Sequence, residues 1–381
     1  MIINGNIVSN NKCAYGKIEF ENDKIKSVDL ISECKKDAQW VLPGFIDVHL
    51  HGIYRGDATP ELVHLMAEDA PASGLTTFCP AIASDAPEKM LEFVKVVRDL
   101  VENPSENNSK VAGSHLEGPF LNMEHKGGMN ENLIRNIDLH EIEELLAAAD
   151  GTIKIMTLSP ELENAMQATR LLSRNNVRVS AGHTGLKPEK VAEFVENGGK
   201  AVCHLFDTFD GRPVVNGVMS VSLADEVLVN DNLYIELISD GVHVPPTLLK
   251  MAIRAAGVDR ILAITDSMCG TGMPDGAYPM TDAGRSFTLK NGDCCRLTDN
   301  PDIIVGSCLT MDRAFYNLVE RDGFSVIDAM KMTSYNAARY LDIADKTGSL
   351  QSGLAADIAV LSADKQQVLQ TFIDGTMVYE H

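Results

Sequence analysis

The chain is poor in basic residues. It has 33 Lys and Arg against 54 Asp and Glu, which gives a formal net charge of −21. Such a charge repels the phosphates of nucleic acids and the surface of anionic membranes, so we expect neither as a partner. It also repels a small anionic substrate at long range. A phosphorylated substrate would therefore need a basic residue at the site itself.

The chain also lacks long apolar segments and closely paired cysteine motifs. No stretch approaches about 18 uninterrupted apolar residues, and the opening MIING has neither the basic nor the apolar region of a signal peptide. We therefore expect a cytoplasmic location. The eight cysteines are scattered and form no CxxC motif, which favours reduced thiols over disulfides or a zinc ribbon.

With 45% hydrophobic and 23% charged residues, the composition is typical of globular proteins. Short apolar runs alternate with segments of helical periodicity, as in βα units around a parallel sheet. Eight runs are predicted as strands: residues 44–48, 76–82, 111–116, 153–158, 177–181, 201–205, 234–238 and 261–265. No glycine-rich dinucleotide turn follows the first run, so the pattern favours an α/β fold of the closed (β/α)8 barrel type over an open doubly wound sheet.

Both ends of the chain carry short strand-like runs, at residues 2–8, 17–28, 357–361, 371–373 and 377–379. We expect residues 1–42 and 346–381 to form one small β-sandwich domain beside a barrel of residues 43–345. Within the barrel, residues 278–299 are predicted as a β-hairpin insertion. Residues 139–148, 191–197, 312–320 and 326–341 are predicted as helices.

Five stretches place a histidine or a carboxylate at or just after the end of a predicted strand. They are DVHLH at 47–51, HLEGPF at 115–120, GHT at 182–184, CHLF at 203–206 and TDS at 265–267. Residues this far apart in sequence meet only if the fold brings strand ends together, and a barrel does so at its C-terminal face. The pattern predicts a metal site there.

Glu117, His183 and His204 fall at the same end of three predicted strands. A carboxylate and two imidazoles would hold a tetrahedral Zn²⁺ and leave one position open for water. The alternative for Glu117 is an ordinary surface glutamate.

His49 and His51 lie two residues apart, so on an extended strand both point to the same side and could chelate one ion. Alternatively, they are two loop histidines. Asp47, in register with them, is a third inward group or a residue that orients the histidines.

Asp266 follows the apolar run 261–264, where an unpaired carboxylate is costly unless it meets a metal or a proton. We predict that it is the general base and acid, which takes a proton from a metal-activated water and delivers it to the leaving group. A helix N-cap is the structural alternative. His243 follows the seventh predicted strand. It is a metal ligand, a substrate contact or an oxyanion group, and we favour substrate contact because Glu117, His183 and His204 already supply three ligands to the metal.

Together these motifs resemble the amidohydrolase superfamily, and most closely the N-acetylglucosamine-6-phosphate deacetylases. The similarity also covers LPGFID at 42–47, DGVHV at 240–244 and residues 306–313 and 353–357. The resemblance implies hydrolysis of the substrate's acetamide, with Glu117, His183 and His204 as metal ligands and Asp266 as acid and base. It implies that His243 contacts the sugar phosphate, and that the small-molecule substrate is an amino sugar.

Zn²⁺ is the expected ion, although Fe²⁺, Co²⁺ and Mn²⁺ suit the same ligands. One or two divalent ions per chain are expected, the second on His49 and His51. The resemblance also implies a homodimer, in which a residue such as Arg212 reaches the neighbouring site.

Three departures from this family fall in the substrate-binding loops. Met129 stands where the family has a histidine, and methionine cannot donate a hydrogen bond to a carbonyl; His125 is a candidate replacement. Asp207 replaces an asparagine, and its charge repels a phosphate. The segment leading to the family's phosphate-binding arginine is short, so Arg212 is either that arginine or a solvated surface residue. The expected substrate-binding residues are Gly128, Met129, Asp207, Thr208, Arg212, His243, Val305 and Gly306.

The leading hypothesis is therefore a cytoplasmic, metal-dependent deacetylase that converts N-acetylglucosamine 6-phosphate to glucosamine 6-phosphate and acetate. A second hypothesis is another amidohydrolase, acting on a different N-acyl amino sugar, an N-acyl amino acid or a cyclic amide. A third is a non-catalytic sugar-binding barrel, which is disfavoured because neither the ligands nor the base are missing.

Overall fold

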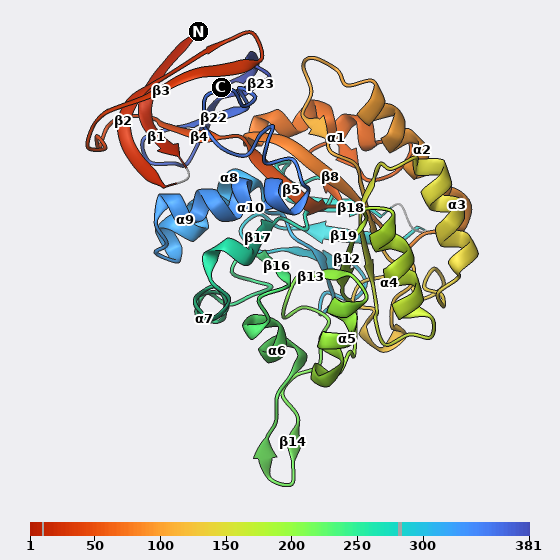
Figure 1. The fold of residues 1–381 in the computed structure, drawn as a ribbon. Coiled ribbons are helices and arrows are strands. Elements are labelled where there is room, and N and C mark those ends of the chain that lie inside the picture. The colour runs from red at the N-terminus through yellow and green to blue at the C-terminus, as the bar shows by residue number, and fades with distance from the viewer. Residues whose placement is uncertain (10, 281–283) are drawn as a thin grey trace.

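Eight parallel strands form a nearly closed barrel at the centre of the computed structural model, which describes residues 1–9, 11–280 and 284–381 (Figure 1). Their hydrogen-bonded order is β17-β16-β13-β12-β11-β10-β8-β5. Asn10, which follows the expected strand-like run 2–8, and residues 281–283 of the expected insertion lie outside the described residues. The barrel strands are β5 (Phe45–Leu50), β8 (Leu75–Ala83), β10 (Ser114–Glu117), β11 (Ile153–Leu158), β12 (Arg178–Ala181), β13 (Gly199–Val202), β16 (Tyr234–Ile238) and β17 (Ile261–Ile264).

The first and last barrel strands are joined at their C-terminal ends. The Asp266 N–H donates to the His49 carbonyl over 2.9 Å, and the His51 N–H donates to the Ser267 carbonyl over 2.8 Å. Asp47 adds a side-chain link, because its Oδ2 accepts from the Thr265 hydroxyl over 2.6 Å. The prediction of a barrel of eight strands is thereby confirmed.

Two of the predicted strands differ from the structure by more than a shift of one or two residues at their ends. The expected strand 111–116 is divided into β9 (Lys110–Val111) and β10, with Gly113 between them at φ 146°. The expected strand 201–205 begins at Gly199 and ends at Val202, because His204 has a φ of 21°, which is incompatible with a strand.

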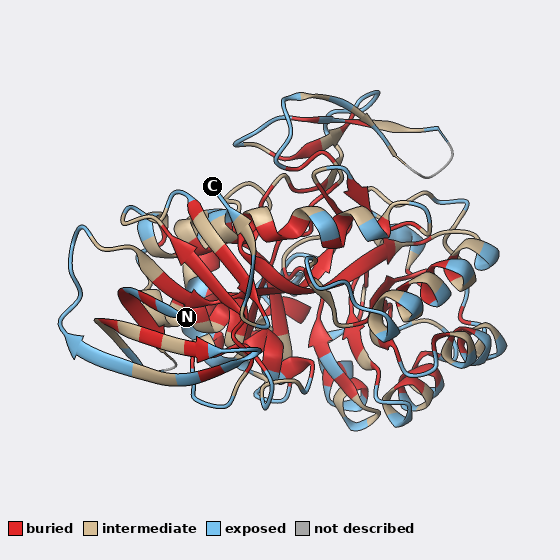
Figure 2. Cartoon of the chain, turned by 90° about the horizontal axis from the view of Figure 1, so that it is seen from above, coloured by how far each residue is buried: buried red, intermediate tan, exposed pale blue. Residues whose placement is uncertain are grey.

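Helices surround the barrel, and the longer ones bury one face each (Figures 1 and 2). In α2, the buried residues Met90, Phe93, Val94 and Val97 recur at helical spacing. The predicted helix 326–341 consists of α9 and α10 joined by a π-helical segment, Lys331–Tyr335. The helices are α1 (Val63–Asp69), α2 (Pro87–Glu102), α3 (Leu139–Ala149), α4 (Ala165–Arg174), α5 (Val191–Glu196), α6 (Leu223–Val229), α7 (Pro246–Ala256), α8 (Met311–Tyr316), α9 (Val326–Met330) and α10 (Asn336–Tyr340).

The two ends of the chain build one seven-stranded mixed sheet, here called the terminal sheet, in the order β24-β23-β22-β4-β1-β2-β3. Its strands are β1 (Ile2–Ser9), β2 (Lys12–Glu21), β3 (Lys24–Ser32), β4 (Trp40–Pro43), β22 (Ile358–Leu361), β23 (Val368–Ile373) and β24 (Thr376–Glu380). Strand β4 pairs parallel to β1 and antiparallel to β22, so it joins the two chain ends. A separate small core, which includes Phe20 and Phe372, packs on this sheet.

Two insertions lie on the barrel. The first is a four-stranded antiparallel sheet, here called the inserted sheet, of β18 (Gly276–Pro279), β19 (Ser286–Leu289), β20 (Cys295–Leu297) and β21 (Ile304–Gly306). It extends beyond the predicted hairpin and forms a layer over one end of the barrel (Figure 2). The second is the hairpin of β14 (Val214–Val215) and β15 (Val218–Met219), which projects away from the barrel (Figure 1). Two short strands, β6 (Gly52–Ile53) and β7 (Gly56–Asp57), follow β5.

None of the helices among the described residues combines the length and the apolar character needed to cross a membrane.

Candidate active site

Three of the predicted site residues leave their strands in the same way. His183, His204 and Asp266 each lie two residues beyond the last residue of β12, β13 and β17. Each has a positive φ, of 48°, 21° and 49° respectively. This conformation is uncommon for residues other than glycine and clusters at functional sites. The repeated turn brings all three side chains to the C-terminal mouth of the barrel.

Glu117, the last residue of β10, lies at the centre of this group. Its Oε1 is 3.2 Å from His183 Nε2 and 2.9 Å from His204 Nε2. The two histidines of β5 approach the same carboxylate, with His49 Nε2 at 3.5 Å from Oε1 and His51 Nε2 at 3.2 Å from Oε2. The prediction that His49 and His51 point to one side of the strand is therefore confirmed.

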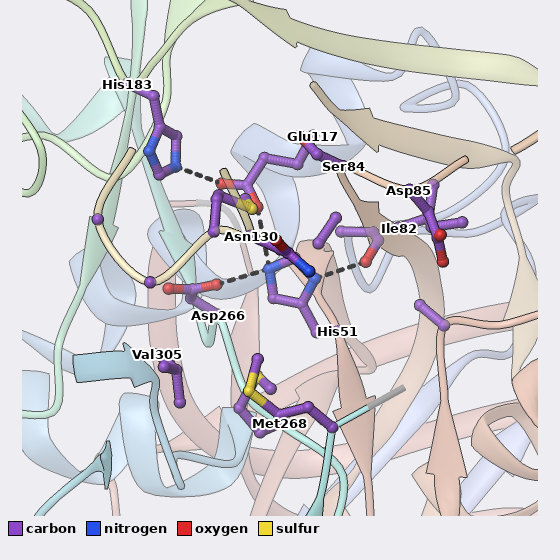
Figure 3. Close-up of a pocket in the computed structure, with 18 of the residues that line it drawn as sticks. His51, Ile82, Ser84, Asp85, Glu117, Asn130, His183, Asp266, Met268 and Val305 are labelled. Carbon is purple, nitrogen blue, oxygen red and sulfur yellow. Dashed lines mark hydrogen bonds and ion pairs between the residues drawn. The ribbon is translucent and has the colours of Figure 1, made fainter. Parts of the chain in front are cut away.

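Asp266 approaches the same nitrogen of His51 as Glu117 does, with Oδ1 3.1 Å from His51 Nε2 (Figure 3). All six side chains are buried, from 0% exposed at His49 to 8% at His51. Asp47 is buried below them and accepts the His49 backbone N–H over 3.0 Å. It ties β5 to β17 and does not enter the cluster.

Opposite charges dominate the electrostatics of this cluster. Burial alone would raise the pKa of Glu117, but the charge of His49 and hydrogen bonds from His183 and His204 hold it well below its usual range. Burial would lower the pKa of His51, yet hydrogen bonds to Asp266 and Glu117 raise it to about 9. The space between the carboxylates of Glu117 and Asp266 therefore strongly favours a positive charge.

In three of the histidines, the ring nitrogen that faces away from Glu117 has a partner of its own. His49 Nδ1 is 2.9 Å from Glu236 Oε2, His51 Nδ1 is 2.6 Å from the Ala81 carbonyl, and His183 Nδ1 is 2.9 Å from the His125 carbonyl. A carbonyl only accepts, so Nδ1 carries the proton in His51 and His183, and Nε2 faces Glu117 with its lone pair when the ring is neutral. Such outer partners are typical of metal-binding histidines.

These residues fit a divalent metal. The ligand atoms of His49, His51 and Glu117 lie within 4.8 Å of one another, as do those of Glu117, Cys203 and His204. His49 Nε2 and His204 Nδ1 are fully buried and have no hydrogen-bond partner among the described residues. Carboxylate and imidazole donors suit Zn²⁺ and the other first-row ions.

His115 lies beneath the cluster and takes no part in it. Its Nδ1 is 2.9 Å from the Val48 carbonyl and its Nε2 is 2.8 Å from the Thr157 hydroxyl, so both nitrogens are already used. Burial lowers the pKa of this imidazole well below its usual value.

A cavity opens above the cluster at the barrel mouth (Figure 3). Its walls include six of the eight predicted substrate-binding residues, namely Gly128, Met129, Asp207, Thr208, Val305 and Gly306. His243 does not line it. Its side chain is buried, with Nδ1 2.5 Å from Asp240 Oδ2 and with Nε2 lacking a hydrogen bond among the described residues.

Arg212 is not brought to the cavity of its own chain. It lies beside the projecting hairpin, half-exposed, and its Nη2 is 2.5 Å from Asp225 Oδ1. His125 does not line the cavity either, so the structure places Met129, and not His125, at the wall where the family's histidine was expected.

Several site residues escaped the sequence reasoning, and three of them are Glu236, Asn130 and Arg285. Glu236 is a fully buried carboxylate in β16, and its position within the apolar run 234–238 was a usable signal, because an unpaired carboxylate there would be costly. Asn130 and Arg285 line the cavity from two loops, the second of which directly precedes β19 of the inserted sheet. Nothing in their local sequence distinguishes them from surface residues.

Comparison with known proteins agrees with this geometry. A model described as "Amidohydrolase family" matches residues 40–378. An N-acetylglucosamine-6-phosphate deacetylase from Bacillus subtilis is 31% identical, over 89% of this chain and 84% of the relative. An N-acetylgalactosamine-6-phosphate deacetylase from Escherichia coli O157:H7 is 28% identical, over 91% of this chain and 90% of the relative.

Solved structures are similar along the whole chain. An N-acetylglucosamine-6-phosphate deacetylase from Thermotoga maritima has a TM-score of 0.88 and 29% identity, with 100% of both chains covered. A mutant deacetylase from Mycobacterium smegmatis, in complex with N-acetyl-D-glucosamine-6-phosphate, has a TM-score of 0.89 and 27% identity, with 99% of both chains covered.

The chain therefore belongs to the amidohydrolase family, and within it to the family that includes the N-acetylglucosamine-6-phosphate deacetylases. It is a metal-dependent amide hydrolase.

Proposed function

We propose that this enzyme removes the acetyl group from N-acetylglucosamine 6-phosphate and releases acetate and glucosamine 6-phosphate. The observation that carries the proposal is the cluster of Glu117 with four imidazoles and Asp266 at the floor of a cavity. Relatives and structural neighbours that act on this substrate by name support it.

Glu117, His183 and His204 would hold the catalytic metal. A divalent metal in such a site supplies a hydroxide nucleophile at neutral pH and charge stabilisation for the amide oxygen. Asp266, beside His51 and facing the cavity, takes a proton from the attacking water and gives it to the amide nitrogen. The carbon–oxygen bond of acetate forms, the carbon–nitrogen bond breaks, and the sugar leaves as a free amine.

His49 and His51 would hold a second ion that shares Glu117. The close approach of both histidines to this carboxylate supports two ions per chain. We propose Zn²⁺ as the resident metal.

The cavity walls would bind the sugar through the loops that carry Gly128, Met129, Thr208 and Gly306. We place His243 at the sugar's edge, where a rotation of its ring would expose the unpartnered Nε2 to substrate. A second candidate substrate is the 4-epimer, N-acetylgalactosamine 6-phosphate. The similarity to the Escherichia coli enzyme named for that substrate supports it.

We also propose a homodimer. The projecting hairpin carries Val214, Val215, Val218 and Met219, each between 54% and 68% exposed, and Arg212 lies at its base. Burial of these side chains against a second copy would remove an apolar patch from water. Light scattering coupled to size exclusion tests this state, and a monomer at micromolar concentration would contradict it.

Acetate release tests the function directly. Metal-loaded protein should release acetate from N-acetylglucosamine 6-phosphate, and Asp266→Asn should lower kcat by about 100-fold or more, as loss of a general acid and base does. Asp47→Asn is a buried control outside the cavity. Absence of acetate from either 6-phosphorylated sugar, with metal bound, would refute the proposal.

A further inference from the structure

Two cysteines of the terminal sheet lie close together, far from the barrel mouth in sequence. Cys13 belongs to β2, and Cys34 lies two residues beyond the last residue of β3. Their Sγ atoms are 2.9 Å apart, against about 2.05 Å in a disulfide bond. An approach of less than about 1 Å would therefore bring the two sulfur atoms to bonding distance.

The register of the terminal sheet explains why these residues meet. Strands β2 and β3 are antiparallel, and at the open end of their ladder Tyr15 pairs with Ser32. Continued by two residues along each strand, this register places Cys13 opposite Cys34 and on the same face as that pair. Opposite residues of antiparallel strands have Cβ atoms about 4.5–5.5 Å apart, which is close to the separation that a disulfide requires.

The segment that carries Cys34 is anchored to the sheet. The Lys35 N–H donates to Asn6 Oδ1 over 2.8 Å, and Asn6 Nδ2 donates to the Lys35 carbonyl over 2.8 Å. Asn6 lies on β1 and is fully buried. Lys35 Nζ is also 3.5 Å from the centre of the Tyr15 ring. These contacts hold the residue next to Cys34, so the closeness of the two sulfur atoms is built into the fold.

The two thiols differ in their access to solvent. Cys34 is exposed, whereas Cys13 is half-buried. Burial and the neighbouring Cys34 raise the pKa of Cys13 to about 12, so this thiol stays protonated near neutral pH. Because the thiolate is the form that attacks a disulfide, an oxidant in solution should react first at Cys34.

The other partly exposed cysteines have different partners. Cys269 Sγ is 3.8 Å from the Pro279 carbonyl, and Cys308 Sγ is 3.4 Å from the Lys290 carbonyl. The buried cysteines are Cys79, Cys203, Cys294 and Cys295. Oxidation by a small molecule is therefore expected at Cys13 and Cys34 before these positions.

We propose that Cys13 and Cys34 form a reversible disulfide when they meet a small-molecule disulfide such as glutathione disulfide. The Cys34 thiolate attacks one sulfur of the oxidant, which forms a mixed disulfide and releases one glutathione thiolate. Cys13 then loses its proton and attacks Cys34 Sγ, which breaks the mixed disulfide and releases the second glutathione. The protein gives up two electrons, and the oxidant is reduced to two thiols.

The bond cross-links β2 to the segment that leads from β3 to β4, and it joins residues 21 positions apart. Strand β3 is an edge strand of the terminal sheet, so one side of it has no neighbouring strand. A cross-link restricts the unfolded chain and thereby stabilises the folded one. The disulfide would thus stabilise the terminal sheet under oxidising conditions, and this role does not depend on the proposed deacetylase function.

Peptide mapping tests the bond directly. Folded, metal-loaded protein is incubated in glutathione buffers of increasing oxidised fraction, its remaining thiols are alkylated, and its peptides are identified by mass spectrometry. The wild type should lose two alkylatable thiols and yield a linked Cys13–Cys34 peptide that carries no glutathione. Dithiothreitol should restore both thiols. Two unchanged thiols in the most oxidising buffer, or glutathione retained on both cysteines, would overturn the proposal.

Single substitutions test the order of the two steps. Cys13→Ser cannot close the bond, so Cys34 should retain one glutathione. Cys34→Ser should take up glutathione on Cys13 at least about tenfold more slowly, because that thiol is half-buried and protonated. Cys308→Ser is the matched control and should still yield the linked peptide. Equal rates of uptake in the first two variants would contradict an initial attack by Cys34.

Thermal unfolding tests the stabilising effect. Oxidation should raise the Tm of the wild type by about 2–5 °C, whereas the Tm of Cys13→Ser should change by less than about 1 °C in the same buffers. A linked peptide without a rise in Tm would overturn the stabilising role of the disulfide.

Discussion

Substitution of Glu236 tests whether its contact with His49 strengthens metal binding at the proposed second site. Its Oε2 lies 2.9 Å from His49 Nδ1, and both side chains are fully buried. A hydrogen bond to a charged group contributes about 1.5–3 kcal/mol, and each 1.4 kcal/mol is about tenfold in affinity. Glu236→Gln keeps an acceptor but removes the charge, so we expect about tenfold weaker binding of the ion that contacts His49. Glu236→Ala removes both and should weaken it by about 100-fold.

The assay measures the number of Zn²⁺ ions bound per chain at a fixed free Zn²⁺ concentration, which a chelator buffer sets. The readout is occupancy by the second ion. Tyr340→Phe is the matched control, since this buried hydroxyl lies near Glu236 and has no hydrogen bond among the described residues. Wild-type occupancy in both Glu236 variants would refute the reasoning. A wild type that never binds more than one ion would refute the second site itself.

Three further predictions concern the metal and stability. Dialysis against a chelator should abolish acetate release and added Zn²⁺ should restore it; full activity of metal-free protein would contradict this. Lys110→Met should lower the free energy of unfolding by about 2–3 kcal/mol, because Lys110 Nζ lies 2.9 Å from buried Asp357 and joins the barrel to the terminal sheet. Exposed Lys17→Met should cost less than about 1 kcal/mol in the same denaturant titration, and equal losses would argue against the role of Lys110. Burial raises the pKa of Asp312, so the folded wild type loses stability as the pH rises from the unfolded value of 3.8 through the raised pKa. Asp312→Asn should therefore gain stability over the wild type across that window, and a pH-independent difference in unfolding free energy would contradict it.

Much of the barrel was predictable from local pattern. The strands 153–158 and 234–238 match β11 and β16, because a short, largely apolar run bounded by polar residues is typical of a buried parallel strand. The sixth strand was overextended, because the turn at His204 is imposed by the barrel mouth and leaves no mark on the apolar run 201–205.

The site residues also fall into those that local sequence patterns predicted and those that they did not. Glu117, His183, His204 and Asp266 were identified because each follows a recognisable strand, and parallel strands of a barrel deliver their C-terminal ends to one face. Arg285 and Asn130 were not identified, because they belong to loops whose course depends on contacts far along the chain.

The sequence by itself determined the barrel, the family and the residues that gather at its mouth, since all three depend on short-range patterns repeated from strand to strand. Only the tertiary structure decided which charges share the cavity. It placed Arg285 in the cavity wall, separated Arg212 from it, and set Glu236 behind His49. Electrostatic interactions depend on distance and burial, and neither can be read from positions along a chain.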